Sequence, residues 1–259
     1  MKGLTIILPS AGLGERLGVN KPKELLEIYK GLPLIQFALQ HMLVSLGKEC
    51  LPLKVAVVIR KGKELVVDYV RGVLPQEVEV CAVYADPRWE EWPGSIYSAR
   101  EQYSELNLVL LPDSFISLSE TDWQRTRDKQ TLLDLAVSGL ERSQVVFGTL
   151  ACDDKETLSQ LGAVRRDAGG EITAFQDKPS DPTGFNAFWG CFAFRSEVSE
   201  TLYRFLSESV RHANPDYSAQ SFFPAQSFSL ADYADLGTWD AIEAFRASYP
   251  VETLGLTCN

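Results

Sequence analysis

The first half of the chain alternates between short apolar runs and longer amphipathic segments. The apolar runs are rich in Leu, Val and Ile, which is typical of strands buried on both faces of a parallel sheet; they occupy residues 4–8, 54–60, 78–84 and 107–111. Apolar residues at helical spacing lie between them, in 33–47, 62–74 and 94–106. This alternation predicts right-handed βαβ crossovers and an open, doubly wound α/β sheet with helices on both faces. Ligands of such sheets bind at the carboxyl ends of the strands.

The second half has a less regular pattern. Residues 145–151 and 187–194 read as strands, and 162–176 reads as two strands joined by a turn at 167–170. Helical spacing returns at 198–212 and 239–247. Because no linker rich in Pro, Gly or Ser and no internal repeat interrupts the 259 residues, we expect a single domain with a mixed, mostly parallel sheet.

Composition narrows the possible partners and the cellular location. A net charge of −10 disfavours binding to nucleic acid or to an anionic membrane. Five cysteines, an odd number without a Cys-x-x-Cys pair, argue against a disulfide framework or a structural zinc site. The apolar run at 4–8 is too short for a signal peptide, and no run approaches the roughly 20 residues of a membrane span. We therefore expect a cytoplasmic protein.

The loop after the first strand, PSAGLGERL, is the first candidate for chemistry. Gly12 and Gly14 permit a tight turn whose backbone N–H groups face an anion, although spacing alone favours a purely structural turn equally. The loop is not a dinucleotide fingerprint, because Leu17 stands where the third glycine would be, and no P-loop motif occurs in the chain. Three cations follow closely, and in an acidic protein such a cluster suggests polyphosphate binding rather than a solvated basic loop; they are Arg16, Lys21 and Lys23.

The stretch PSAGLGERLGVNKPKELLEI resembles the N-terminal signature of sugar-1-phosphate nucleotidylyltransferases of the glucose-1-phosphate thymidylyl- and uridylyltransferase type. The signature couples the glycine turn to a Lys-x-Leu-Leu element, here residues 23–26. Further family motifs follow in the same order along nearly the whole chain: Trp92-Pro93-Gly94 before a helix, Leu111-Pro112-Asp113 after a strand, Gly162-Ala163-Val164, Asp177-Lys178-Pro179, the strand Ala187 to Phe194, and Asp235-Leu236-Gly237-Thr238. Taken singly, Asp113 could be a helix cap, and Asp235 and Asp177-Lys178-Pro179 could be turns.

The resemblance implies a three-layer α/β/α, nucleotidyltransferase-like (Rossmann-like) domain. Residues 1–115 would bind the nucleotide and 116–259 the sugar phosphate. The implied reaction joins a nucleoside triphosphate and a sugar-1-phosphate, giving an NDP-sugar and pyrophosphate. A homo-oligomer is also implied. The implied roles are these: catalysis by Arg16 and Lys23; nucleotide binding by Ala11, Gly12, Gly14 and Gly94; sugar-phosphate binding by Gly162, Asp177 and Lys178; and Mg²⁺ binding by Asp113 and Asp235.

The residue types suit this chemistry. Phosphoryl transfer gathers charge on oxygens around phosphorus, so positioned cations and magnesium supply most of the catalysis. No side-chain nucleophile is needed, and we expect both histidines, His41 and His212, to be structural or solvent-facing. Trp89, Trp92 and Trp189 are core candidates, with Trp189 or Phe188 as alternatives for lining the sugar pocket.

Three departures from the signature leave other functions open. Glu15 stands where threonine is usual, Pro112 where glycine is usual, and Asp177 where the longer glutamate is usual. The first alternative is a catalytically weakened or inactive nucleotidyltransferase-like protein that binds nucleotide or sugar phosphate in a regulatory role. The second is a related cytidylyltransferase acting on a non-sugar phosphate. The sequence does not distinguish the nucleobase or the sugar.

Overall fold

The computed structural model describes residues 3–45, 53–89, 91–118, 130–211 and 215–250. Within these ranges nine strands form one sheet in the order β5-β4-β1-β6-β11-β8-β12-β10-β9. The strands of this sheet are β1 (Leu4–Pro9), β4 (Leu53–Ile59), β5 (Glu79–Tyr84), β6 (Leu106–Leu110), β8 (Val145–Ala151), β9 (Gly162–Arg166), β10 (Glu171–Asp177), β11 (Ala187–Arg195) and β12 (Ala225–Ser229). All the strands predicted from apolar runs are present, and the structure adds β12.

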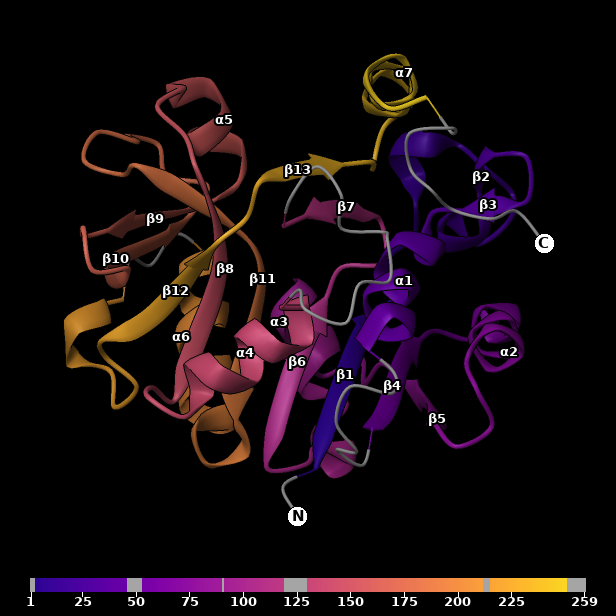
Figure 1. The fold of residues 1–259 in the computed structure, drawn as a ribbon, viewed down its shortest axis with the longest axis horizontal. Coiled ribbons are helices and arrows are strands. Elements are labelled where there is room, and N and C mark those ends of the chain that lie inside the picture. The colour runs from indigo at the N-terminus through magenta and orange to yellow at the C-terminus, as the bar shows by residue number, and fades with distance from the viewer. Residues whose placement is uncertain (1–2, 46–52, 90, 119–129, 212–214, 251–259) are drawn as a thin grey trace.

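The sheet is parallel at one end and mixed at the other. Strands β5, β4, β1 and β6 are parallel, whereas β11 runs antiparallel to both β6 and β8. Strand β12 is parallel to β8, and β10 is antiparallel to β12 and to β9. Figure 1 shows the two ends on opposite sides of the molecule, with β4 and β5 at the right and β9 and β10 at the left. The predicted mixed, mostly parallel sheet is confirmed.

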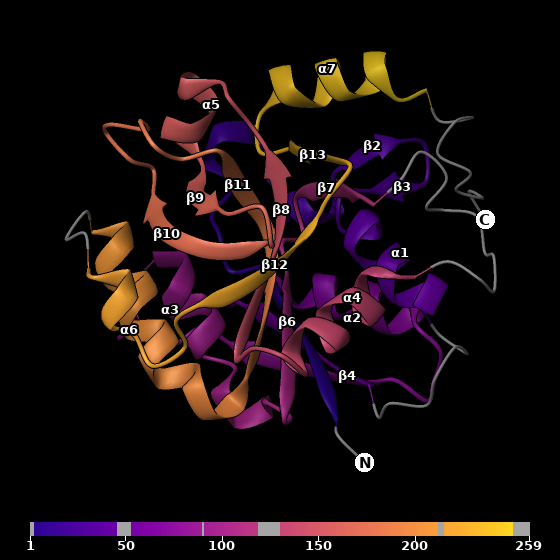
Figure 2. The ribbon, with the colours of Figure 1, turned by 60° about the vertical axis from the view of Figure 1, so that its left-hand side comes forward.

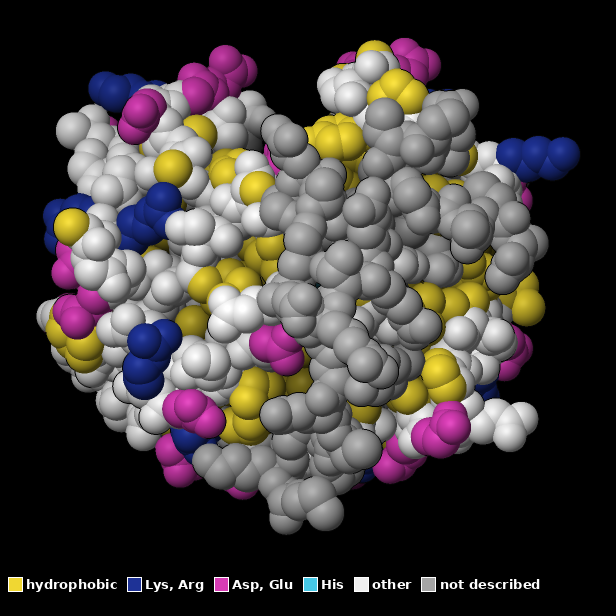
Figure 3. Space-filling view, in the orientation of Figure 1, with side chains coloured by type: hydrophobic (Ala, Val, Ile, Leu, Met, Phe, Trp, Pro, Cys, Tyr) yellow, Lys and Arg dark blue, Asp and Glu magenta, His cyan; other side chains and the backbone are white. Residues whose placement is uncertain are grey.

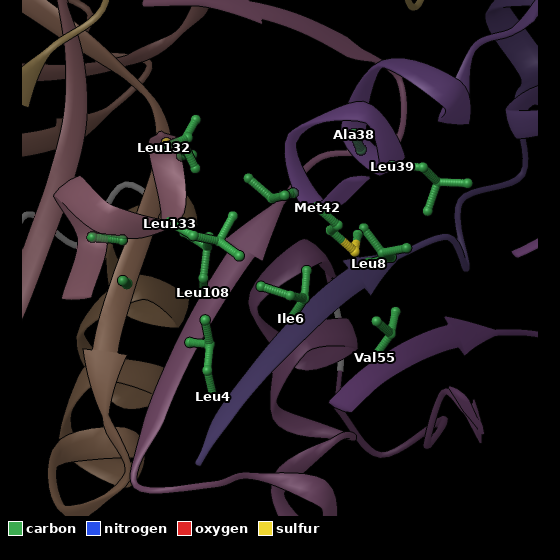
Figure 4. Close-up of a cluster of buried hydrophobic side chains, with 14 of the residues drawn as sticks. Leu4, Ile6, Leu8, Ala38, Leu39, Met42, Val55, Leu108, Leu132 and Leu133 are labelled. Atoms are coloured by element: carbon green, nitrogen blue, oxygen red, sulfur yellow. The ribbon is translucent and has the colours of Figure 1, made fainter. Parts of the chain in front are cut away.

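Helices cover both faces of the sheet, which makes the three layers seen in Figure 2. One apolar cluster joins alternate residues of β1 to three helices on one face, and Figure 4 shows Leu4, Ile6 and Leu8 within it. These helices are α1 (Ile35–Ser45), α2 (Glu64–Val73) and α4 (Leu132–Leu140). On the other face Ile7 packs in a second cluster with α3 (Glu91–Tyr97) and α6 (Ser199–Val210). Successive side chains of β1 point to opposite faces because a strand has a two-residue period, and Leu4 to Leu8 are all buried because both faces are covered.

Two small sheets and a third apolar cluster lie at the carboxyl ends of the parallel strands. The sheets pair β7 (Ser114–Ser117) with β13 (Asp232–Asp235), and β2 (Glu27–Tyr29) with β3 (Leu32–Pro33). Leu17, Phe115 and Leu236 join α7 (Trp239–Ser248) in the third cluster. The remaining helix, α5 (Lys155–Gln160), lies on the side of the molecule away from α7, and Figure 3 shows a notch between these two sides.

One predicted boundary is wrong. The spacing predicted a helix over 94–106, but α3 begins at Glu91 and ends at Tyr97, followed by a 3-10 turn over Arg100–Gln102. Trp92-Pro93-Gly94 therefore lies inside the helix instead of preceding it. Proline is tolerated in a first helical turn because its missing N–H would have no partner there. No helix in the described ranges has the length and apolar character needed to cross a membrane.

Candidate functional site

The glycine loop lies at the carboxyl end of β1, as predicted. Gly14 has a φ of 73°, a conformation that side chains other than glycine rarely adopt, and it leads directly into a 3-10 turn over Glu15–Leu17. Gly12 is exposed, and so are Glu15 and Arg16. The loop therefore presents backbone to solvent immediately beside two charged side chains.

The side chain of Lys23 extends along the glycine loop to the carboxylate of Asp113. A Cβ atom placed on Gly14 would lie 3.3 Å from Cβ of Lys23, and one placed on Gly12 would lie 3.8 Å from its Nζ. The ammonium group of Lys23 forms an ion pair with Oδ2 of Asp113, and both side chains are 15% exposed. Two predicted site residues 90 positions apart in the sequence are thus in direct contact.

Asp113 and Asp235 lie beside each other because β7 pairs with β13. Asp235 is opposite Ser114 in the register, and the N–H of Leu236 donates to the carbonyl oxygen of Asp113 at 2.9 Å. Burial raises the pKa of Asp235, and the neighbouring Asp113 carboxylate raises it further. Arg16, the N–H of Gly237 and Lys23 act in the opposite direction on this pKa. The arrangement is a pair of carboxylates surrounded by positive charge.

Arg16 lies against the turn that follows Asp235. A Cβ atom on Gly237 would be only 2.5 Å from Nη2 of Arg16 and 2.9 Å from Oδ1 of Asp235, so the guanidinium lies directly over this glycine. The indole N–H of Trp239 donates to the carbonyl oxygen of Leu17 at 2.9 Å, which ties α7 to the same loop. The Asp-x-Gly-Thr motif and the N-terminal signature form one structure, whereas Lys21 is simply exposed.

A second set of predicted residues gathers at the end of β10. Asp177 is opposite Gly162 in the antiparallel pair of β10 and β9, and Lys178 follows it with a φ of 44°. Asp177 is buried and its N–H donates to Oγ of Ser209 at 3.0 Å, whereas Lys178 is exposed. Gly162 packs against Trp189, because a Cβ atom at this position would lie 1.8 Å from its Nε1.

Aromatic side chains connect the two sets. The hydroxyl oxygens of Tyr233 and Ser114 are 3.1 Å apart, so Tyr233 reaches the residue next to Asp113. Its ring lies edge-on to Phe188 at 5.3 Å between centroids. Phe188 in turn is paired with Ala163, the neighbour of Gly162. Tyr233 was not among the predicted site residues, because its contacts depend on the pairing of β13 with β7.

Gly94 occupies a different environment from the other predicted nucleotide-binding residues. It is buried within α3, where a Cβ atom would lie 2.4 Å from the backbone carbonyl group of Trp89. This contact explains why glycine is needed for packing, and its predicted role at the nucleotide stays a prediction. His41 is also buried, with Nε2 3.2 Å from the carbonyl oxygen of Ile116, whereas His212 lies outside the described residues.

Comparison with known proteins gives a family. A family model described as nucleotidyl transferase matches residues 4–250. The chain belongs to the nucleotidyl transferase family. The family resemblance read from the sequence is confirmed at this level. No curated protein sequence matches the chain.

Solved structures share the fold of this nucleotidyl transferase at low sequence identity. A UDP-glucose pyrophosphorylase from Acinetobacter baumannii superposes with a TM-score of 0.70 at 16% identity, covering 98% of this chain and 96% of the other. A UDP-glucose pyrophosphorylase complexed with UDP-glucose gives 0.70 at 18% identity, with 96% and 99% covered. A putative glucose-1-phosphate thymidylyltransferase from Bacillus anthracis gives 0.67 at 14% identity, with 95% of each chain covered. The predicted α/β/α fold is confirmed by these matches.

Two charged residues of this nucleotidyl transferase that contact the loop, Lys63 and Arg60, were missed from the sequence. Lys63 bonds to both carboxylate oxygens of Glu24 and to the carbonyl oxygen of Ser10, and Nε of Arg60 donates to the carbonyl oxygen of Ala11. Lys63 and Arg60 follow β4 in a polar loop, where lysine and arginine are ordinary. Only the parallel pairing of β1 with β4 brings them to the glycine loop.

Proposed function

We propose that this chain transfers a nucleoside monophosphate from a nucleoside triphosphate to a sugar-1-phosphate, with Mg²⁺ as cofactor, releasing pyrophosphate. The observation that carries the proposal is the convergence of distant motifs: Lys23 pairs with Asp113, and Arg16 lies against the Asp235–Gly237 turn. Family membership supports nucleotidyl transfer. The solved relatives named for UDP-glucose and glucose-1-phosphate support a sugar phosphate as the acceptor.

In the proposed reaction a phosphate oxygen of the acceptor attacks the α-phosphorus of the nucleotide. One P–O bond forms, and the bond from the α-phosphorus to the bridging oxygen of the β-phosphate breaks, so that pyrophosphate leaves with the electron pair. The attacking phosphate is already ionised at neutral pH, and no protein base has to remove a proton. This agrees with a site built from cations and carboxylates.

The cations of the site would stabilise charge that develops on phosphate oxygens. Lys23, fixed along the glycine loop, would approach the α-phosphate as a point charge. The planar guanidinium of Arg16 would hold the leaving pyrophosphate with paired hydrogen bonds. Backbone N–H groups of Ala11, Gly12 and Gly14 would contact the nucleotide, because peptide groups in such a loop form an anion-binding concavity.

The two carboxylates fit a magnesium ion. Among the described residues no group of three or more His, Cys, Asp and Glu side chains is gathered for a metal. Magnesium, however, takes one or two carboxylates and completes its shell with substrate phosphates and water, which Asp113 and Asp235 allow. Burial and, after it, the neighbouring Asp113 carboxylate raise the pKa of Asp235, and a cation bound between the two carboxylates would offset their repulsion. When bound there, the ion would neutralise phosphate charge.

The acceptor would lie at the second set of residues. Lys178 is exposed and would offset the charge of the sugar phosphate, helping to bring two anions together. The indole N–H of Trp189 is buried beside Gly162 and has no hydrogen-bond partner in the described part of the chain. Because this nitrogen is packed against Gly162, the ring would shape the acceptor side by packing rather than offer its N–H to the substrate.

The proposal is tested by measuring pyrophosphate release with a panel of nucleoside triphosphates and acceptors, with and without Mg²⁺. The acceptors are sugar-1-phosphates and, in a separate arm, non-sugar phosphates. We expect release for one pair, abolished by a chelator and greatly reduced in Lys23→Met. The matched control is Lys30→Met, which removes an exposed lysine beyond β2. No release from any pair, with nucleotide binding intact by calorimetry, would favour the inactive, regulatory alternative. Release only with a non-sugar phosphate would favour the cytidylyltransferase alternative.

Cellular location and oligomeric state are two further parts of the proposed function. We propose a cytoplasmic location, because the three cysteines in the described ranges, Cys81, Cys152 and Cys191, are free thiols. We also propose a homo-oligomer, on the family resemblance alone. Light scattering coupled to size-exclusion chromatography measures the mass in solution, and a mass of 28.8 kDa would contradict the oligomer.

A further inference from the structure

Lys63 and Glu24 form a buried ion pair behind the glycine loop. Nζ of Lys63 lies 2.8 and 2.9 Å from the two carboxylate oxygens of Glu24. Glu24 is completely buried and Lys63 is 7% exposed. Burial lowers the pKa of Lys63, with Glu24 acting in the opposite direction. Since a buried pair of charges seldom stabilises a fold more than apolar residues of similar size, stability alone does not explain why it is here.

The same ammonium group also holds the backbone of the loop. Nζ of Lys63 donates to the carbonyl oxygen of Ser10 at 2.9 Å, and Nε of Arg60 donates to the carbonyl oxygen of Ala11. Two consecutive carbonyl groups at the start of the loop are therefore bound to cations that follow β4. A carbonyl oxygen that faced a phosphate would repel it. Because Lys63 and Arg60 bind these two oxygens, neither carbonyl group can point toward an anion bound at the loop.

Glu24 connects this network to Lys23. The two residues are adjacent in a single 3-10 turn over Lys23–Leu25, so fixing the Glu24 carboxylate fixes the backbone from which Lys23 extends. Lys63 thus contacts both structures whose relative position matters, the glycine loop through Ser10 and the Lys23 turn through Glu24. Lys23 then spans the distance between them, along Gly14 and Gly12 to Asp113.

We propose that Lys63 is a positioning residue that, with Glu24 and assisted by Arg60, fixes the glycine loop relative to Lys23 for nucleotidyl transfer. The inference rests on the proposed function for its catalytic consequence. Misplacement of a catalytic group by about 1 Å costs on the order of 10²-fold in rate. Loss of the network should therefore lower kcat while leaving KM for the nucleotide little changed.

The test separates positioning from folding by removing the charges together. Lys63→Met alone leaves the buried Glu24 carboxylate without a positively charged partner. We therefore expect a large decrease in the free energy of unfolding. In the double variant Glu24→Met/Lys63→Met no buried charge remains, and the urea midpoint should return toward that of the parent chain. We expect kcat of the double variant to stay about 10²-fold low. The matched control is Lys61→Met, which removes an exposed lysine from the same loop.

Arg60→Met is a second variant in case the double variant does not fold, because Arg60 is exposed and its removal strands no charge. Hydrogen exchange is measured in all variants for the amides of Ser10, Leu17 and Gly18, which donate to backbone carbonyl groups at the two ends of the loop. Faster exchange in Glu24→Met/Lys63→Met or Arg60→Met than in Lys61→Met supports positioning. A double variant with both parental stability and parental kcat would overturn it.

Hydrogen exchange does not depend on catalysis, so it tests the role of Lys63 even if the proposed function fails. If the parent chain releases no pyrophosphate with any substrate pair, the proposed function fails. Hydrogen exchange at the loop still decides the inference: exchange equal to that of Lys61→Met overturns it, and faster exchange supports it.

Discussion

The two sets of site residues are held in place by different interactions. On the side of the glycine loop, ion pairs fix the functional groups: Lys63 with Glu24, and Lys23 with Asp113. At the end of β10, close packing of rings on glycine does so, as Gly162 against Trp189 shows. Ion pairs hold charged side chains at fixed positions, which suits the binding of a highly charged triphosphate. Packing of aromatic rings shapes a surface without adding charge, which suits a largely neutral sugar.

The largest expected difference between the two sides concerns catalysis. Lys23→Met removes the cation that we propose contacts the reacting phosphate, and we expect kcat to fall by about 10²–10³-fold, as for loss of an oxyanion donor. Lys178→Met removes an exposed cation at the proposed acceptor side, and we expect mainly a higher KM for the sugar phosphate. Steady-state kinetics with each substrate varied in turn checks both. Equal effects of the two variants on kcat would contradict the division into two sides.

Ring packing at the acceptor side predicts a strong response to a single methyl group. In Gly162→Ala the new Cβ atom would meet Nε1 of Trp189 at 1.8 Å, and we expect a loss of about 1–3 kcal/mol in the free energy of unfolding. The control is Gly72→Ala in α2, where a Cβ atom meets nothing within 4 Å and should stabilise by up to about 1 kcal/mol. Urea denaturation measures both. An unchanged midpoint for Gly162→Ala would mean that Trp189 moves aside without cost.

The Asp-x-Gly-Thr motif predicts a smaller effect at its threonine. Oγ1 of Thr238 accepts from the N–H of Ala241 and caps α7, so Thr238→Ala should cost about 1 kcal/mol in stability. Ser221→Ala, at an exposed turn position, is the control. Thermal or urea unfolding checks the change, with kinetics alongside. A change in KM without a change in stability would show that the hydroxyl contacts a substrate instead.

The smallest effect concerns an exposed ion pair near α3, in contrast to the buried pair of Lys63 and Glu24. Hydrogen bonds from the Arg88 side chain lower the pKa of Asp86 to about 2. A lowered pKa means that the fold favours the charged carboxylate, and this contribution disappears as pH falls from 3.8 through about 2. Arg88→Gln should move the pKa back toward 3.8 with little change in stability at neutral pH. Carbon NMR titration of the carboxyl group measures it; a titration midpoint that Arg88→Gln leaves unmoved would rule out this cause.

Much of the candidate site could be read from the sequence because its motifs are local. The glycine loop, Lys23, Asp113 and Asp235 each follow an apolar run or a turn signal, and the family signature linked them. The contacts of Lys63 and Tyr233 could not be read in this way. Each depends on a partner 39 or more residues away, brought close by strand pairing.

The sequence by itself determined the buried strands, most helices and the order of the family motifs, since apolar periodicity and glycine turns act over a few residues. Tertiary structure alone decided the pairing of β7 with β13, the start of α3 at Glu91, and the capture of the Ser10 carbonyl by Lys63. The physical reason is the distance along the sequence over which each kind of interaction acts. Burial and turn preferences are properties of neighbouring residues, whereas ion pairs and sheet register are formed by residues that only the folded chain brings together.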